Sequence, residues 1–117
     1  MRQREQTQTS ESNLSTAGIA RFQIAGYVQE VKRNEKMKCD YVRFYITSKV
    51  KPEYYDIIAV NVPDAVGVCC ENGDCIVING FIRSWNRNGA FSLEMVAERV
   101  AQIAPEQLEG LNNGKKA

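Results

Sequence analysis

Apolar and polar residues alternate with a period of two through the middle of the chain. In the stretch DYVRFYITSK, residues 40–49, one set of alternate positions holds Val42, Phe44 and Ile46, and the other holds Tyr41, Arg43 and Tyr45. Successive side chains of a β-strand point to opposite faces, so this pattern predicts a strand with one core face and one face in water. The face in water carries two aromatic rings with a guanidinium group between them.

Four other segments show short apolar runs divided by turn signals. They are residues 21–32, 54–62, 75–85 and 90–100, the last of which is expected to bend or pass into helix near Ala97. Residues 63–74 begin with Pro-Asp and end with Asn-Gly, which is typical of a short helical turn. Residues 86–89, Asn-Arg-Asn-Gly, predict a hairpin turn.

Five strands with a short helical segment between the third and the fourth predict an all-β fold, a five-stranded OB-type barrel. A small sandwich is the alternative, but it would leave the helical insert without a purpose. The barrel is expected over residues 19–104. Residues 1–18, rich in Gln, Ser and Thr, predict a disordered N-terminal tail, and residues 105–117 are interpreted as a C-terminal tail.

The fourth strand repeats the pattern of the second on its outward positions. If Ile76, Ile78 and Ile82 face the core, then Phe81, Arg83 and Trp85 face outward. Aromatic side chains stack under successive bases of an unpaired strand, and Arg adds cation–π and phosphate contacts. The two ring–Arg–ring strands therefore indicate a track for single-stranded nucleic acid. Each ring also has a structural alternative: cross-strand packing of the tyrosines, capping of the barrel by Trp85, or a subunit interface at Phe81.

Charge is concentrated in one segment although the net charge is only +1. Residues 32–51 carry +5, whereas the segments before and after carry 0 and −4. A basic segment in a nearly neutral protein suits an anionic partner on one face, and a solvated loop is the alternative. The candidate phosphate-binding residues are Lys32, Arg33, Lys36, Lys38, Lys49 and Arg87.

Several kinds of chemistry are disfavoured by composition. The chain has no His, which removes the commonest general base, and no nucleophile–base pair or Gly-rich phosphate loop is present, so we expect no enzyme and no cofactor. The four cysteines, Cys39, Cys69, Cys70 and Cys75, do not follow paired zinc spacing and are interpreted as reduced thiols, with no metal. No apolar run is long enough for a membrane helix and no secretory signal is found, which predicts a cytoplasmic protein.

Residues 21–103 also resemble the bacterial-type single-stranded DNA-binding proteins. The matching segments are IAGYV (24–28), EYYDIIAV (53–60), NGDCIVINGFIR (72–83) and LEMVAERV (93–100). The resemblance implies an OB fold, sequence-tolerant binding of single-stranded DNA, and a homo-dimer or homo-tetramer formed partly through the first strand. By position it assigns stacking roles to Tyr54 and Trp85, whereas the pattern alone leaves open which of Tyr54 and Tyr55 is exposed.

Three features depart from the family pattern. Val60 stands where the family often has an aromatic ring, and Asp56 is expected to place a carboxylate beside the track, so both predict weaker binding or a shifted path. The chain ends at LNNGKKA and lacks the acidic tip of cellular members. A phage, plasmid or accessory protein, or a primosomal relative, is expected to fit better.

Together these features predict single-stranded DNA binding in replication, recombination or plasmid and phage DNA metabolism. RNA is also an acceptable ligand, because stacking grooves tolerate both sugars. The alternative function is an OB-fold protein-interaction module of a primosome-like or other nucleoprotein assembly.

Overall fold

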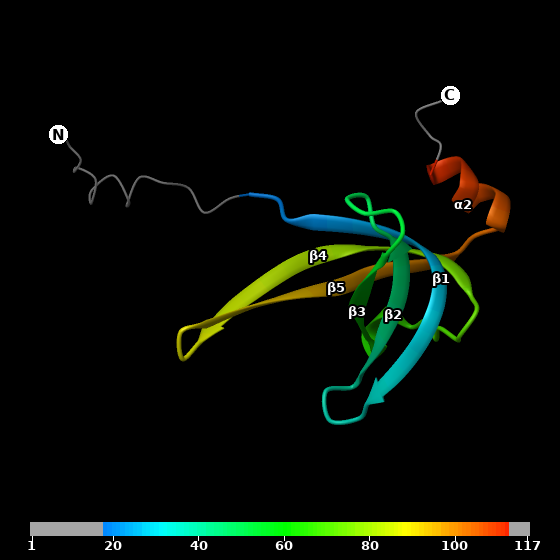
Figure 1. Cartoon of the computed structure of the whole chain (residues 1–117). Coiled ribbons are helices and arrows are strands. Elements are labelled where there is room, and N and C mark those ends of the chain that lie inside the picture. The colour runs from blue at the N-terminus through cyan, green and yellow to red at the C-terminus, as the bar shows by residue number, and fades with distance from the viewer. Residues whose placement is uncertain (1–17, 113–117) are drawn as a thin grey trace.

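Five strands follow one another along the chain, with one turn of 3-10 helix between the third and the fourth (Figure 1). The computed structural model describes residues 18–112, except for the side chain of Arg87, so nearly all of the predicted N-terminal tail lies outside the described residues. The elements are β1 Arg21–Asn34, β2 Cys39–Thr47, β3 Tyr55–Pro63, η1 Asp64–Val66, β4 Cys75–Arg87 and β5 Ala90–Gln102. The predicted strand order and the position of the helical insert are confirmed.

The strands close into a barrel in the order β1-β2-β3-β5-β4. Strand β1 pairs with two neighbouring strands. Residues Arg21–Tyr27 pair with β4, and the later residues pair with β2. Gln29 is an extra residue in the second pairing. Such a bulge bends a strand, which lets β1 pass from one neighbour to the other. A parallel contact between Asn61 of β3 and Val96 of β5 completes the barrel and confirms the OB-type fold.

The core consists of alternate residues of the strands, as a period of two requires. Val42 and Phe44 of β2 are fully buried, and Ile46 packs against the core at its margin, as predicted. The other fully enclosed side chains include Val60, Ile76 and Ile78. The core pattern read from the second strand is thus confirmed, and the predicted inward positions of Ile76 and Ile78 are confirmed as well.

Strands β4 and β5 continue past the barrel as a long two-stranded arm (Figure 1). The arm ends in a two-residue turn in which Asn88 and Gly89 both have positive φ, the geometry of a tight hairpin that Asn-Gly favours. Because the arm leaves the barrel after Gly80, Ile82 does not join the core cluster. It is half-buried and lines an outer groove, so its predicted inward position is wrong.

Strand β5 bends where the sequence suggested a change. Asn79 faces Arg99 and Gly80 faces Ala97, which leaves Glu98 as an extra residue. The strand then continues to Gln102 and does not turn into helix near Ala97. The bulge and Gly80 together allow β4 and β5 to curve sharply at the edge of the barrel.

A helix, α2 Pro105–Asn112, follows β5 where the sequence was interpreted as a tail. Pro105 occupies the first helical position, and the Gln107 side chain accepts a hydrogen bond from the Ala104 backbone N–H at 2.8 Å. Both are recognised signals of a helix start. Residues 105–112, interpreted from the sequence as part of a tail, therefore form a helix, and the local signal Ala-Pro-Glu-Gln was present in the sequence.

Candidate nucleic-acid interface

The outer face of β2 and β3 is aromatic and largely exposed. Antiparallel pairing sets Tyr45 opposite Ile57 and Thr47 opposite Tyr55 on this face. The rings of Tyr45 and Tyr55 stack with centroids 4.6 Å apart and planes 10° from parallel. Tyr55 and Ile57 remain 55% and 56% exposed. Flat rings fixed by a neighbour and open to solvent offer a platform for a nucleobase.

A groove continues this surface between the β2–β3 face and the arm formed by β4 and β5. Its volume is about 390 Å³, which lies within the usual range of ligand pockets. The groove is lined by Tyr41, Ala59, Asn61, Ile82, Trp85, Leu93, Glu94 and Met95. An adjoining hollow adds Met37, Arg83 and Asn86 to the same surface. The groove thus has an apolar floor with one ring from β2 and one from β4.

Cations in the interface are held by local partners. The Arg83 guanidinium carbon lies 5.6 Å from the centre of the Trp85 ring, and its Nε lies 3.7 Å from the Glu94 carboxylate. Arg43 forms an ion pair with Glu30 at 3.0 Å. Burial is the main cause that raises the pKa of the Tyr41 hydroxyl, so this ring stays neutral at physiological pH.

Arg33 is the centre of an ion-pair cluster. Its guanidinium group donates to Asp64 at 2.7 and 2.9 Å and contacts Asp40 and Glu35, each at 3.2 Å. These carboxylates raise the pKa of Arg33, and Arg33 in turn lowers the pKa of Asp64. The cluster joins β1 and β2 to η1. Arg33, predicted as a phosphate contact, is therefore engaged within the fold.

The remaining predicted cations lie at the two ends of the aromatic face. Lys36 and Lys38 flank Met37 in the β1–β2 loop, next to the groove, and Lys32 is exposed on β1. Lys49 follows β2 at the other end. Within residues 18–112, the structure shows no ion pair for these four lysines. The side chain of Arg87, also predicted to bind, lies outside the described residues.

The structure does not bring every predicted ring into the groove. Phe81 is half-buried between Arg21 of β1 and Val96 of β5 and does not line the groove. Tyr54 precedes β3, is exposed, and lies under the Lys51 ammonium group at 5.9 Å. Tyr55 is the residue that stacks on Tyr45. The alternation of residues in the sequence does not decide which of these two neighbouring tyrosines joins the track.

Two features expected to weaken the track lie elsewhere. Val60 is fully buried in the core, so it does not stand at a stacking position. Asp56 pairs with Ile46 and, with Ile24 and Ile58, lines a pocket beside α2. Neither residue belongs to the outer face of β2 and β3, so the expected position of Asp56 beside the track is wrong, and weaker binding or a shifted path stays a prediction. Leu93 and Phe91, both exposed on the arm, were not predicted as surface features.

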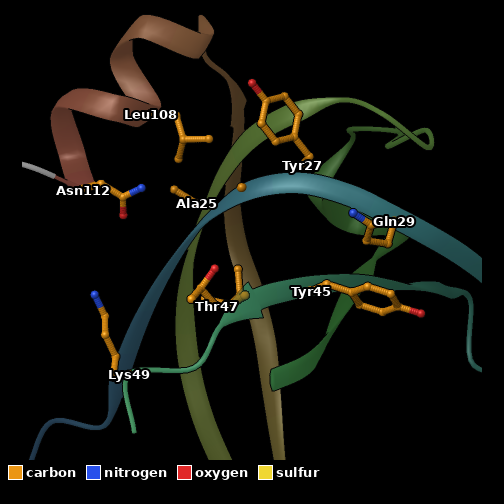
Figure 2. Close-up of a pocket in the computed structure, with 10 residues that line it drawn as sticks. Ala25, Tyr27, Gln29, Tyr45, Thr47, Lys49, Leu108 and Asn112 are labelled. Carbon is orange, nitrogen blue, oxygen red and sulfur yellow. The ribbon is translucent and has the colours of Figure 1, made fainter. Parts of the chain in front are cut away.

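A separate hollow lies between α2 and the barrel (Figure 2). Leu108 and Asn112 of α2 face β1 and β2 across it, and Lys49 extends toward Asn112 from below. The ring of Tyr45 points away from the helix in this view. The hollow therefore meets the aromatic face only at its end, where Tyr45 and Lys49 lie.

The cysteines divide by exposure. Cys39 and Cys70 are buried, Cys75 is half-buried and Cys69 is exposed, and all four are free thiols. Burial raises the pKa of the Cys39 thiol and raises that of Cys70 to about 11. In the part of the chain that the structure describes, no three His, Cys, Asp or Glu side chains gather as a metal-binding group. Over the same residues, no helix has the length and hydropathy needed to span a bilayer.

The closed five-stranded barrel and its outer groove define the chain as an OB-type protein with an aromatic face. Two similar solved structures are the N-terminal domain of PriB from Thermoanaerobacter tencongensis and Rim1, a mitochondrial single-stranded DNA-binding protein of S. cerevisiae. The PriB domain is 18% identical with a TM-score of 0.52, and the match covers 73% of this chain and 97% of that one. Rim1 is 8% identical with a TM-score of 0.53, over 74% and 97% of the two chains.

These likenesses confirm the fold that the sequence resemblance implied. No protein-family model matches the sequence, and a search of curated proteins finds no significant match. At such low identity the similar structures do not assign individual residues, so the interface above depends on the geometry of this chain.

Proposed function

We propose that the protein binds single-stranded DNA along the outer face of β2 and β3 and the adjoining groove. The observation that carries the proposal is the exposed Tyr45–Tyr55 stack, continued by a groove with Tyr41 on one strand and Trp85 on another. Stacking on such rings tolerates any base, since every base has a π-face. The named activity of Rim1, a protein of the same fold, supports the proposal.

Phosphate neutralisation completes the proposed mechanism. Lys36 and Lys38 lie at the groove end of the face and Lys49 at the other end, so a strand lying along the rings has cations near both of its ends. Duplex DNA hides its base faces and would not use the rings. An unpaired strand is therefore the ligand that suits both parts of the surface, and RNA shares the chemistry.

Binding is tested with a labelled oligo(dT) of about 12 nucleotides, a length within the range that one OB domain covers. Anisotropy should rise on addition of protein, and the fluorescence of Trp85, the sole Trp of the chain, should be quenched. The variant Y45A/Y55A should lose most of the affinity. Phe91→Ala is the matched control, because Phe91 is an exposed ring on the arm that does not line the groove. An unchanged signal with every oligonucleotide would refute the proposal.

The second candidate function is a protein-interaction module. It is favoured by Phe91 and Leu93, which leave two large apolar side chains 67% and 66% exposed on the arm. Exposed apolar groups of this kind often anchor a protein partner. The F91A variant separates the functions: DNA binding that survives F91A and is lost in Y45A/Y55A supports the first.

We also propose that the chain forms a homo-dimer or homo-tetramer through β1. Tyr27 leaves a ring 47% exposed on this strand, next to the bulge at Gln29, which suits a surface that pairs with a second copy. The PriB domain is described as dimeric, which supports the proposal. Light scattering gives the mass, and Tyr27→Ala should shift it toward the monomer. Roles in replication, recombination or plasmid and phage DNA metabolism, and a cytoplasmic location, remain predictions.

A further inference from the structure

A carboxylate lines the groove that we assign to DNA, and this placement needs an explanation. Glu94 of β5 lines the groove together with Tyr41 and Trp85, most of the exposed groove surface is apolar, and the Glu94 side chain is only 20% exposed. A carboxylate repels phosphate, so it opposes the backbone contacts of a nucleic-acid groove. A surface that served stacking alone would gain by replacing it.

The neighbours of Glu94 hold it but do not use all of its hydrogen-bonding capacity. Oε2 accepts one hydrogen bond from Asn61 Nδ2 at 2.8 Å. Among the described side chains, the cation that pairs with Glu94 is Arg83, whose Nε is 3.7 Å from Oε1, which exceeds hydrogen-bond distance. An ionised carboxylate offers about four acceptor positions. Glu94 therefore retains acceptor capacity in a half-enclosed apolar groove, where an added donor would contribute strongly.

Asn61 fixes the orientation of this carboxylate. Its Nδ2 donates to Glu94, while its Oδ1 is buried without a hydrogen-bond partner among the described residues. The hydrogen bond to Glu94 is thus the interaction that orients the amide, and the amide in turn positions the carboxylate. The site is built from two elements, since Asn61 belongs to β3 and Glu94 to β5.

The bases differ in what they can offer to a carboxylate. Guanine presents two adjacent donors, the N1–H and the 2-amino group, which match the two oxygens of a carboxylate. Thymine presents one N3–H between two carbonyl oxygens that a carboxylate repels. Adenine and cytosine present one amino group beside a ring-nitrogen acceptor. Guanine is therefore the base that complements Glu94 best.

We propose that this groove is a guanine-selective pocket within the DNA track, in which Glu94 accepts from the N1–H and the 2-amino group while Tyr41 and Trp85 flank the base. The inference depends on the proposed function and refines it: the exposed Tyr45–Tyr55 stack accepts any base, and one position of the bound strand is read. Asn61 acts as a positioning residue for the carboxylate.

Oligonucleotides test this with the unaltered protein. Three strands of about 12 nucleotides are compared, all thymine except for one central guanine, hypoxanthine or thymine. Hypoxanthine keeps the N1–H of guanine and lacks the 2-amino group. The guanine strand should bind about fivefold or more tightly than either of the others, as a bidentate base contact predicts. Trp85 lines the same groove, so its quenching should be deepest with guanine.

A pair of variants assigns the preference to Glu94. The variant Glu94→Gln should bind the guanine strand and the hypoxanthine strand with affinities that agree within about twofold. Glu98→Gln is the matched control, because Glu98 is on the same strand, pairs with Arg21 at 2.9 Å, and does not line the groove. Both variants remove one negative charge, so both should show the same general gain in affinity for DNA. Only the ratio of the affinities for the guanine and hypoxanthine strands should differ between the two variants.

The outcomes separate the two proposals. Equal binding of the three strands by the wild-type protein overturns the guanine pocket and leaves DNA binding in place. A guanine preference that persists in E94Q overturns the role of Glu94. Absence of binding to all three strands overturns the proposed function itself. Because the comparison of guanine with hypoxanthine needs no variant, a misfolded E94Q would not prevent the test.

Discussion

Tyr54 and Tyr55 are neighbours in the chain but occupy different surroundings. Tyr55 stacks on Tyr45 of β2, whereas Tyr54 precedes the strand and contacts Lys51. Tyr54 matches a family stacking position by sequence, and Tyr55 belongs to the aromatic face by geometry. The geometry indicates that Tyr55 contributes more than Tyr54 to stacking on a base, because a ring fixed by its neighbour loses less conformational freedom when a base binds.

We therefore predict that Tyr55→Ala weakens oligo(dT) binding by about 1–3 kcal/mol and that Tyr54→Ala weakens it by less. Anisotropy titration at one fixed salt concentration measures both. Thermal unfolding serves as the control, since loss of the Tyr45–Tyr55 stack should also destabilise the fold by about 0.5–1.5 kcal/mol. A larger loss in Tyr54→Ala would return the stacking role to the position indicated by the resemblance.

For single residues, the sequence predicts which side chains face the core better than it predicts which side chains form the binding site. A period of two identified Val42 and Phe44 as core residues because burial on one face constrains every second position. The partners of the outward residues depend on strand register, which the pattern does not contain. Tyr55 opposite Thr47 and Glu94 beside Asn61 follow from register, so the aromatic stack and the carboxylate of the groove could not be predicted.

At the scale of elements, the curvature of β4 depends on one position without a side chain. A Cβ on Gly80 would collide with the Val96 carbonyl oxygen and lie 2.9 Å from the Phe22 ring. We predict that Gly80→Ala destabilises the protein by about 1–3 kcal/mol or more, since the backbone of β5 cannot yield as a flexible side chain could. Urea denaturation measures the loss.

Gly110→Ala is the control for that substitution. Gly110 lies in α2 and a Cβ there would meet nothing within 4 Å. Replacement by Ala in a helix should leave stability unchanged or raise it by up to about 1 kcal/mol. Equal destabilisation by both substitutions would contradict the close packing of β4 on β5 at Gly80.

The ion-pair cluster at Arg33 predicts a loss of stability in acid. Arg33 holds the pKa of Asp64 below its unfolded value, so the contribution of this pair is present above the unfolded pKa, about 3.9, and is lost as the pH falls through the lower folded pKa. Asp64→Asn should lower stability at neutral pH and flatten its decline below about pH 4. Thermal unfolding from pH 7 to pH 2 measures the profile.

The variant Arg33→Ala tests whether the ion pair with Arg33 causes the effect of Asp64 on stability in acid. Without the guanidinium group, Asp64→Asn should make no further change to the acid profile, because the two groups act on each other directly. A full effect of Asp64→Asn in the Arg33→Ala background would mean that Asp64 acts on the acid profile through a group other than Arg33.

At the scale of the whole molecule, the number and order of strands were predictable and the shape of the binding surface was not. Five apolar runs and one helical insert limit the compact arrangements strongly. The groove exists because β4 and β5 extend beyond the barrel while β5 still meets β3 at Asn61 and Val96. This separation of an arm from a barrel is a property of tertiary packing, which local periodicity does not encode.

The distribution of charge over the folded molecule predicts how binding depends on salt. Arg33, Arg43 and Arg83 are each paired with carboxylates, whereas Lys36, Lys38 and Lys49 lie without ion pairs among the described residues at the two ends of the aromatic face. Only a few phosphates should therefore be neutralised. The logarithm of affinity against the logarithm of salt concentration should have a slope of roughly −1 to −2, since each phosphate contact contributes about −0.7 for single strands.

Two lysine substitutions and one control test whether phosphate contacts at the two ends of the face, and not net charge alone, set the salt dependence. Lys36→Ala and Lys49→Ala should each make the slope shallower by about 0.7, because each removes one phosphate contact. Arg21→Ala removes the same charge from a residue paired with Glu98, away from the groove, and should leave the slope unchanged. Equal effects of all three would mean that binding responds to net charge alone, and the course of the strand between Lys36 and Lys49 would then have no support.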